Sequence, residues 1–90
     1  MFVKALVELI GTFVFLSVIL SQGQAIPIAI ALAAAILFGG SISGGHFNPA
    51  VTVMQALDGK IDTMTSIVYI FTQLIAAVAA FGFAKYVVKQ

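Results

Sequence analysis

The sequence predicts an all-α membrane protein with three transmembrane helices plus one re-entrant loop that carries an Asn-Pro-Ala half-helix. Three observations predict this fold class. The 90 residues are 62% hydrophobic and only 8% charged, which is too apolar for the surface of a soluble domain. Three apolar segments, at about residues 5–20, 25–42 and 65–84, come near the roughly 20 residues that cross a 30 Å hydrocarbon core. Between the last two, about residues 43–57 fit no fourth span, because glycines and Asn48-Pro49-Ala50 interrupt them.

The first apolar segment follows Lys4 and is somewhat short for a span. Lys4 before an apolar run, with Gly23-Gln24-Ala25 after it, could also mark a cleaved signal peptide. Glu8 inside the run argues against cleavage, which would also leave the first helix without a leading segment. We therefore expect this segment to remain as a helix. The polar connection of residues 21–24 is brief, so the first two helices should be antiparallel neighbours.

The second and third apolar segments carry small residues at every fourth position. The rows are Ala31, Ala35 and Gly39 in the second segment, and Ala76, Ala80 and Ala84 in the third. Such rows let membrane helices approach closely, because packing rather than the hydrophobic effect holds them together in lipid. Plain alanine-rich helix explains either row equally well. Both explanations require partner helices.

Residues 43–57 predict a descending loop followed by a half-helix. Asn48 suits the N-cap position, Pro49 suits the first helical position, and Asp58-Gly59 supply a stop. About ten helical residues would span roughly 15 Å, half of the hydrocarbon core. The glycines at 39, 40, 44 and 45 would allow close packing and unusual torsions in the descending leg. The chain could therefore dip to the midplane and return to the side it left.

The chemistry of such a dip indicates a selective pore. Non-helical backbone at membrane depth must be buried by protein or must line water. Here a row of carbonyl oxygens would lead to the positive end of the half-helix, which suits neutral hydrogen-bonding solutes and opposes cations and protons. A surface loop before a short interfacial helix is the alternative, but residues 50–57 have almost no polar face.

Charge and cysteine content exclude several function classes. Four lysines and three acids give a net charge of +1, whereas nucleic-acid binding calls for a dense basic footprint, so no nucleic-acid partner is expected. Without cysteine there is no disulfide framework and no thiolate metal site. Asp58 and Asp62 flank Lys60 in a surface turn and are better explained as solvated than as metal ligands. We expect no catalytic residue, no metal and no cofactor, and the chain is not expected to be an enzyme.

Three motifs, in order along the chain, resemble those of the aquaporin and glycerol-facilitator family, the major intrinsic proteins. Residues 43–52 (Ser-Gly-Gly-His-Phe-Asn-Pro-Ala-Val-Thr) are similar to the first Asn-Pro-Ala loop of that family. Residues 8–12 (Glu-Leu-Ile-Gly-Thr) resemble its first-helix motif. Residues 69–73 (Tyr-Ile-Phe-Thr-Gln), with Ala76-Ala77, resemble its third-helix motif. The resemblance implies that residues 1–90 form a single half-repeat, half of an aquaporin fold.

The resemblance implies roles for the residues of the loop. Asn48 would donate its side-chain amide to the passing solute, as the first residue of the motif that Pro49 and Ala50 complete. Pore-lining carbonyl groups would come from Gly44, Gly45 and His46. The ring of His46 could be structural while its carbonyl group acts.

Further roles are implied on the three helices. Glu8 resembles a buried carboxylate that braces the loop backbone, which fits the rule that intramembrane carboxylates face protein, and Gln73 would brace the same loop. A role of Glu8 as a proton carrier is the weaker alternative. The pore wall and constriction would be formed by Phe15, Ile28, Leu32 and Val51. The first three of these could instead face lipid.

The chain departs from the family pattern at the constriction. The second repeat of the family places an arginine directly after its Asn-Pro-Ala, whereas Val51 follows the motif here and the chain contains no arginine. Ile28 stands where the family's narrow filter carries an aromatic residue. A pore made of two such halves would have a wider and more apolar constriction, and strict selectivity for water would be lost.

The lysines suggest where the second half would come from. Lys4 and Lys60 should lie on one side of the membrane, and Lys85 and Lys89 on the other, so no basic bias sets an orientation. An unbiased chain can insert both ways, which predicts an inverted homodimer with dual topology, and such pseudo-channels would group as tetramers. The expected surroundings are the lipid bilayer of a plasma or inner membrane, with water and small neutral solutes such as glycerol as cargo. The alternatives are a holin-like lesion-forming protein and a truncated half that pairs with another channel chain.

Overall fold

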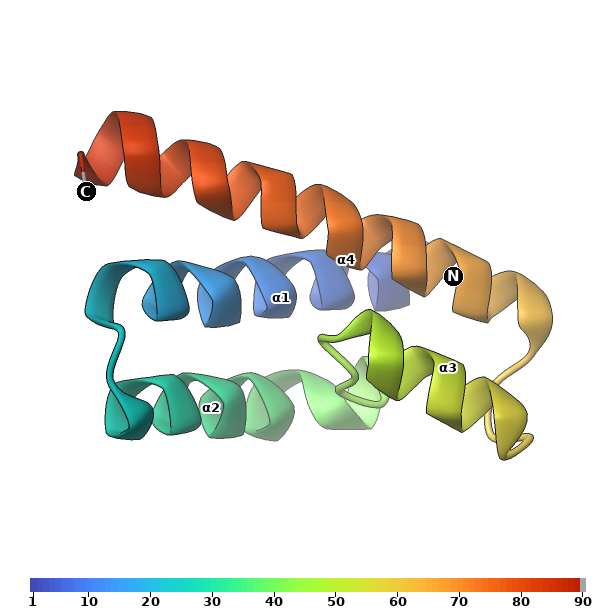
Figure 1. Ribbon diagram of the computed structural model, residues 1–90. Coiled ribbons are helices and arrows are strands. Elements are labelled where there is room, and N and C mark those ends of the chain that lie inside the picture. The colour runs from blue at the N-terminus through green and yellow to red at the C-terminus, as the bar shows by residue number, and fades with distance from the viewer. Residues whose placement is uncertain (90) are drawn as a thin grey trace.

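The computed structural model describes residues 1–89 and is all-α (Figure 1). Its elements are α1 (Phe2–Gln22), α2 (Ala25–Ser43), α3 (Pro49–Leu57), α4 (Thr63–Phe83) and the π-helical turn η1 (Ala84–Val88). The three long helices are each long and apolar enough to cross a membrane, α4 together with η1. They lie side by side in a molecule about 40 Å long and 20–23 Å across, which matches a bilayer with its interfacial layers.

Helix α1 lies between α2 and α4 and is the centre of the packing (Figure 1). It runs antiparallel to α2, as the short connection predicts, and parallel to α4, while α3 packs on α4. The row of small residues in α4 is buried, with Ala76 and Ala80 fully covered. This row therefore serves close packing within the chain.

The helices extend beyond the apolar segments that predict them. Helix α1 has 21 residues, so the expectation of a short first span was wrong. The helix continues through polar residues until Gly23 adopts a left-handed conformation and its N–H closes on the carbonyl of Ile19 at 3.2 Å. Gly44 ends α2 in the same way, with its N–H 2.9 Å from the carbonyl of Gly40. Residues 39 and 40 thus belong to α2, and the leg before α3 is shorter than expected.

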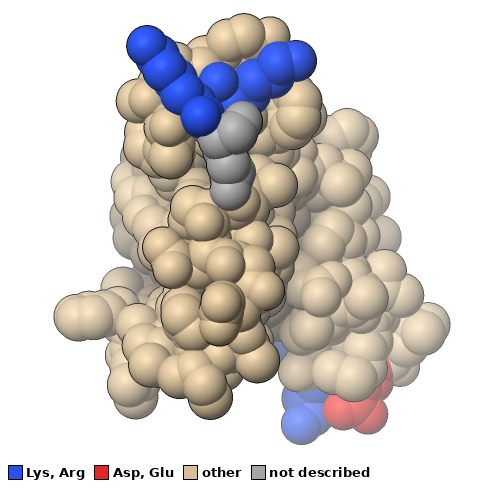
Figure 2. Space-filling view, turned by 60° about the vertical axis from the view of Figure 1, so that its left-hand side comes forward, with Lys and Arg blue, Asp and Glu red and all other residues tan. Residues whose placement is uncertain are grey.

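Much of the buried interior of this protein is polar, whereas many large apolar side chains are exposed. The largest fully buried side chains are Tyr69, Phe47, Gln73, Glu8, Thr12 and Thr52, and four of these six are polar or charged. Large apolar side chains such as Leu37, Phe38 and Val78 are exposed along the helices. Figure 2 shows charged side chains at the two ends of the molecule and an uncharged surface between them. This distribution suits a hydrocarbon solvent.

Candidate functional site

Glu8 lies in the second turn of α1, is fully buried, and accepts four hydrogen bonds. Its Oε1 atom accepts from the backbone N–H of Phe47 at 2.8 Å and from Nε2 of Gln73 at 2.9 Å. Its Oε2 atom accepts from the backbone N–H of His46 at 3.0 Å and from the hydroxyl of Ser43 at 2.7 Å. One carboxylate therefore joins α1 to the end of α2, to the loop after it and to α4.

The backbone of the loop at residues 44–47 turns its N–H groups inward. The Gly45 N–H donates to the Ser43 hydroxyl at 3.2 Å, and the next two N–H groups donate to Glu8. No carbonyl group of residues 44–46 accepts a hydrogen bond from any residue in the described range 1–89. The backbone N–H groups thus hold the loop in place, and the carbonyl groups of residues 44–46 remain available to accept hydrogen bonds.

This inward turn requires left-handed backbone at three of the four loop residues. Gly44 and Gly45 have φ values of 95° and 67°, which glycine adopts without steric cost. Phe47 has a φ of 54°, which costs a bulky residue about 1–3 kcal/mol. The hydrogen bond to Glu8 and the packing of the Phe47 ring offset that cost.

The ring of Phe47 is inserted between α1 and α2 and is only 1% exposed. Gly11 and Gly39 make room for it. A Cβ atom added at Gly11 would lie 2.6 and 2.7 Å from ring atoms Cδ1 and Cζ, and one added at Gly39 would lie 3.2 Å from Cζ. Two glycines on facing helices therefore form the seat that anchors the loop.

A second group of hydrogen bonds connects α3 to α4 and to the loop. Gln73 Nε2 also donates to Thr52 Oγ1 at 2.9 Å, and this hydroxyl lies 2.8 Å from His46 Nδ1. The Tyr69 hydroxyl donates to the Ser43 carbonyl at 2.5 Å, and its ring meets the His46 ring edge to face at 5.1 Å. Loop, α3 and α4 are thereby fixed relative to one another.

Asn48 caps α3 and keeps its amide donors free. Its Oδ1 atom accepts from the backbone N–H of Ala50 at 2.8 Å, and Pro49 occupies the first turn. The Asn48 side chain is exposed, and its NH₂ group donates to no residue in the described part of the chain. The cap therefore points two donors outward at the positive end of α3.

The comparisons with known proteins identify the family. A family model described as "Major intrinsic protein" matches residues 20–90. The chain belongs to the major intrinsic protein family. It is 42% identical to glycerol uptake facilitator protein-like 6 of Lactiplantibacillus plantarum over 92 positions, which cover 91% of this chain and 42% of that relative. No solved structure matches the chain significantly.

Two further relatives carry aquaporin names. The chain is 46% identical to aquaporin TIP2-1 of Arabidopsis thaliana over 57 positions, covering 63% of this chain and 23% of the relative. It is 34% identical to aquaporin-5 of Sus scrofa over 89 positions, covering 90% and 34%. The chain spans less than half the length of each of these relatives. The family resemblance seen in the motifs is confirmed, and with three candidate spans this major intrinsic protein is an integral membrane protein of a family of channels rather than enzymes.

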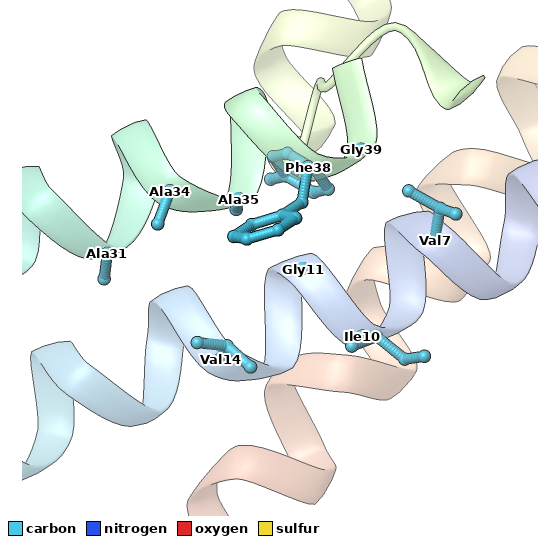
Figure 3. A pocket seen from close by; sticks show the side chains of 10 residues that line it. Val7, Ile10, Gly11, Val14, Ala31, Ala34, Ala35, Phe38 and Gly39 are labelled. Carbon is cyan, nitrogen blue, oxygen red and sulfur yellow. The ribbon is translucent and has the colours of Figure 1, made fainter. Parts of the chain in front are cut away.

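Two hollows lie beside the loop of this major intrinsic protein. The first, of about 420 Å³, is apolar and lies between α1 and α2 (Figure 3). Figure 3 shows that side chains of both helices line it. Phe47 of the loop is also part of its lining. The second, of about 510 Å³, is polar and lies at the end where α1 and α4 begin; Lys4, His46, Lys60 and Tyr69 are among its lining. The loop therefore separates an apolar hollow from a polar one.

The residues predicted for the pore wall lie away from this hydrogen-bonded centre. Phe15 in α1, Ile28 and Leu32 in α2, and Val51 in α3 are half-buried, and none of them lines either hollow. Their roles, like those of the other predicted site residues, stay predictions. The geometry does place Glu8 on the loop backbone, whereas Gln73 reaches the loop only indirectly, through its hydrogen bond to Glu8.

Several contributors to the site were not predicted. Ser43, Thr52 and Tyr69 lie within the recognised motifs, but their hydrogen bonds depend on side-chain directions that the motifs do not specify. The available signal for the Phe47 seat was the presence of Gly11 and Gly39 within the helices α1 and α2. Glycine destabilises a helix, so its presence there indicates that another group approaches the backbone closely. Gln73 Oε1 and Thr12 Oγ1 are buried without a partner among the described residues.

Proposed function

We propose that this chain forms one half of a transmembrane channel for water and small neutral solutes such as glycerol, and that it pairs with a second half-repeat. The observation that carries the proposal is the polarity of the loop. Its N–H groups are bound inside the protein, whereas its carbonyl groups at residues 44–46 and the Asn48 NH₂ group bond to nothing within residues 1–89. A path that offers acceptors and then donors can replace the hydrogen bonds of a neutral solute in water.

The depth of the loop supports a re-entrant position. Gln73 contacts Glu8 and lies ten residues after Thr63, the first residue of α4. At about 1.5 Å per residue this is roughly 15 Å from the start of α4, about half of a 30 Å hydrocarbon core. Helix α3 would then return from the midplane to the side from which the chain entered, with Asn48 at the centre of the membrane. Its positive end would oppose cations there.

The pairing supplies what one half lacks. A single half-helix cannot enclose a pore, and the side of Asn48 that faces away from the chain must meet a complementary wall. A second copy in inverted orientation would place two such asparagines against each other. With Ile28 and Val51 at the constriction and no arginine in the chain, the pore would be wide enough for glycerol.

Liposomes that carry the purified chain test this proposal through the variant Asn48→Asp. The carboxylate keeps the cap oxygen but removes both donors and places a negative charge in the path, so water and glycerol permeability should fall about tenfold or more. Gln24→Glu, the same chemical change in the exposed α1–α2 connection, should leave permeability unaltered. The wild-type protein should conduct no ions.

Three results would count against the proposal. Equal permeability of Asn48→Asp and wild type would reject the pore assignment. Leakage of ions or dye through the wild-type protein would favour a lesion-forming protein. No flux at all would favour a half that needs a different partner chain.

A further inference from the structure

The hydrogen-bond chain from Glu8 fixes the orientation of the Gln73 amide. A carboxylate oxygen carries no hydrogen and can only accept, so the Gln73 atom 2.9 Å from Glu8 Oε1 must be the donor nitrogen rather than the oxygen. The same nitrogen lies 2.9 Å from Thr52 Oγ1. Gln73 therefore donates one N–H to the Glu8 carboxylate and the other to the Thr52 hydroxyl. This orientation of the amide leaves the Gln73 oxygen without a hydrogen-bond partner in residues 1–89, as observed.

The fixed amide in turn determines where the Thr52 hydrogen goes. Thr52 Oγ1 accepts from Gln73 and has one hydrogen to donate. Thr52 is 0% exposed, so its hydrogen must find an acceptor inside the protein. The acceptor within reach in the described chain is His46 Nδ1, at 2.8 Å. His46 Nδ1 is therefore unprotonated, and a neutral His46 must carry its hydrogen on Nε2.

The Nε2 edge of His46 faces the polar hollow. Although the His46 residue is only 8% exposed, it lines that hollow together with Gly44 and Tyr69. A Cβ atom added at Gly44 would lie 3.2 Å from Nε2, so this edge of the ring passes beside the exposed glycine. Nε2 bonds to no residue of the described chain and is not among its buried unpartnered atoms, so it is accessible.

We infer that His46 is a solute-contacting residue that presents an Nε2–H donor to the mouth of the path, and that Thr52, oriented by Gln73, is the positioning residue that fixes this tautomer. The contact between His46 and a solute rests on the proposed channel function. The assignment of the tautomer does not depend on that function. A fixed donor selects solutes that bring an oxygen acceptor, such as water, polyols and ureas. It withholds the imidazole lone pair that ammonium or a metal ion would need.

Nitrogen NMR on the ¹⁵N-histidine-labelled protein in bilayers tests the tautomer, and the chain has only one histidine. In the alkaline range, wild type should show an unprotonated, hydrogen-bonded Nδ1 and a protonated Nε2 in contact with water. In Thr52→Val the Nδ1 resonance should shift and the Nδ1–H tautomer should appear. Thr52→Ser should restore the wild-type spectrum, and Thr63→Val, at the exposed start of α4, should leave it unchanged.

Glycerol permeability of the same variants tests the contact with solute. Thr52→Val should lower it roughly three- to tenfold, and Thr52→Ser should restore it. A dominant Nδ1–H tautomer in wild type, or an Nε2–H with no contact to water, would overturn the inference even if Thr52→Val fails to fold. Unchanged permeability in a folded Thr52→Val variant would overturn the solute contact. The predicted spectra in a protein without any flux would reject the channel function and leave the tautomer standing.

Discussion

At the scale of single residues, Glu8 is the side chain on which the largest number of segments depend. Its two oxygens satisfy two backbone N–H groups that a left-handed loop would otherwise leave unpaired, together with one hydroxyl and one amide. A buried carboxylate in lipid is costly unless it is fully hydrogen-bonded. Glu8 meets that condition, and the conformation of the loop follows from it.

Glu8→Gln should destabilise the protein by about 3 kcal/mol, because an amide provides one acceptor oxygen where the carboxylate provides two and leaves buried donors unpaired. The free energy of unfolding can be measured by titration with a denaturing detergent, followed by helical circular dichroism. Asp58→Asn is the matched control, since the Asp58 side chain is 67% exposed beside Lys60. A Glu8→Gln variant as stable as Asp58→Asn would show that the four hydrogen bonds do not hold the loop.

The sequence predicted that Glu8 and Gln73 approach the loop, but it could not predict which atoms meet. That choice depends on the left-handed torsions at residues 44, 45 and 47, and Phe47 in particular adopts a conformation that few bulky residues adopt. The tautomer of His46 is even harder to predict from the sequence. It follows only when the partners of Thr52 and Gln73 are known.

At the scale of elements, the packing of α1 against α2 is arranged around a loop side chain. The Phe47 ring occupies the space between Gly11 and Gly39, and the apolar hollow of Figure 3 adjoins it. The rows of small residues predicted from the sequence therefore serve different purposes. The row in α4 is buried, whereas the row in α2 lines the hollow and ends at the Phe47 seat.

Gly11→Ala should destabilise the protein by about 1–3 kcal/mol, because the new methyl group would overlap the Phe47 ring. Gly82→Ala is the matched control within α4. A Cβ atom there meets nothing within 4 Å, so the better helix propensity of alanine should stabilise the protein by about 0.5–1 kcal/mol. The same detergent titration measures both variants. Stabilisation by both substitutions would contradict the Phe47 seat.

The limits of the elements illustrate why hydropathy alone gives approximate boundaries. Apolar runs mark where lipid surrounds a helix, but hydrogen bonding continues into polar residues until a glycine such as Gly23 or Gly44 closes the last turn. Helix α3 begins at Pro49, directly after the Asn48 cap, and these two residue types are specific signals for a helix start. The leg before it was overestimated, since the glycines at 39 and 40 are helical.

At the scale of the whole molecule, the charges divide between the two ends. Lys4 and Lys60 line the same polar hollow, and Asp62 is also part of its lining. Lys85 lies at the opposite end, beside Leu20 near the end of α1, and Lys89 follows η1. On the face shown in Figure 2 the surface between these two ends carries no charged side chain. Two lysines at each end give neither end an advantage.

The last prediction concerns this balance. If the chain pairs with an inverted copy, paired C-terminal reporters, each active on one side of the membrane only, should both give a signal in the wild-type protein. Replacing Lys85 and Lys89 with glutamine leaves the basic residues at one end, so nearly all molecules should then carry that end in the cytoplasm. Replacing Lys4 and Lys60 with glutamine should produce the opposite orientation.

The arginine replacements Lys85→Arg and Lys89→Arg retain the charge and should retain both signals, which separates the effect of charge from that of the side chain. A wild-type protein that inserts in one direction only would contradict the inverted homodimer. The Asn48 donors and the loop carbonyls would still require a facing half, and that half would then have to come from a different polypeptide segment of opposite orientation. Orientation and permeability together therefore decide whether two copies of one chain are sufficient to enclose the path.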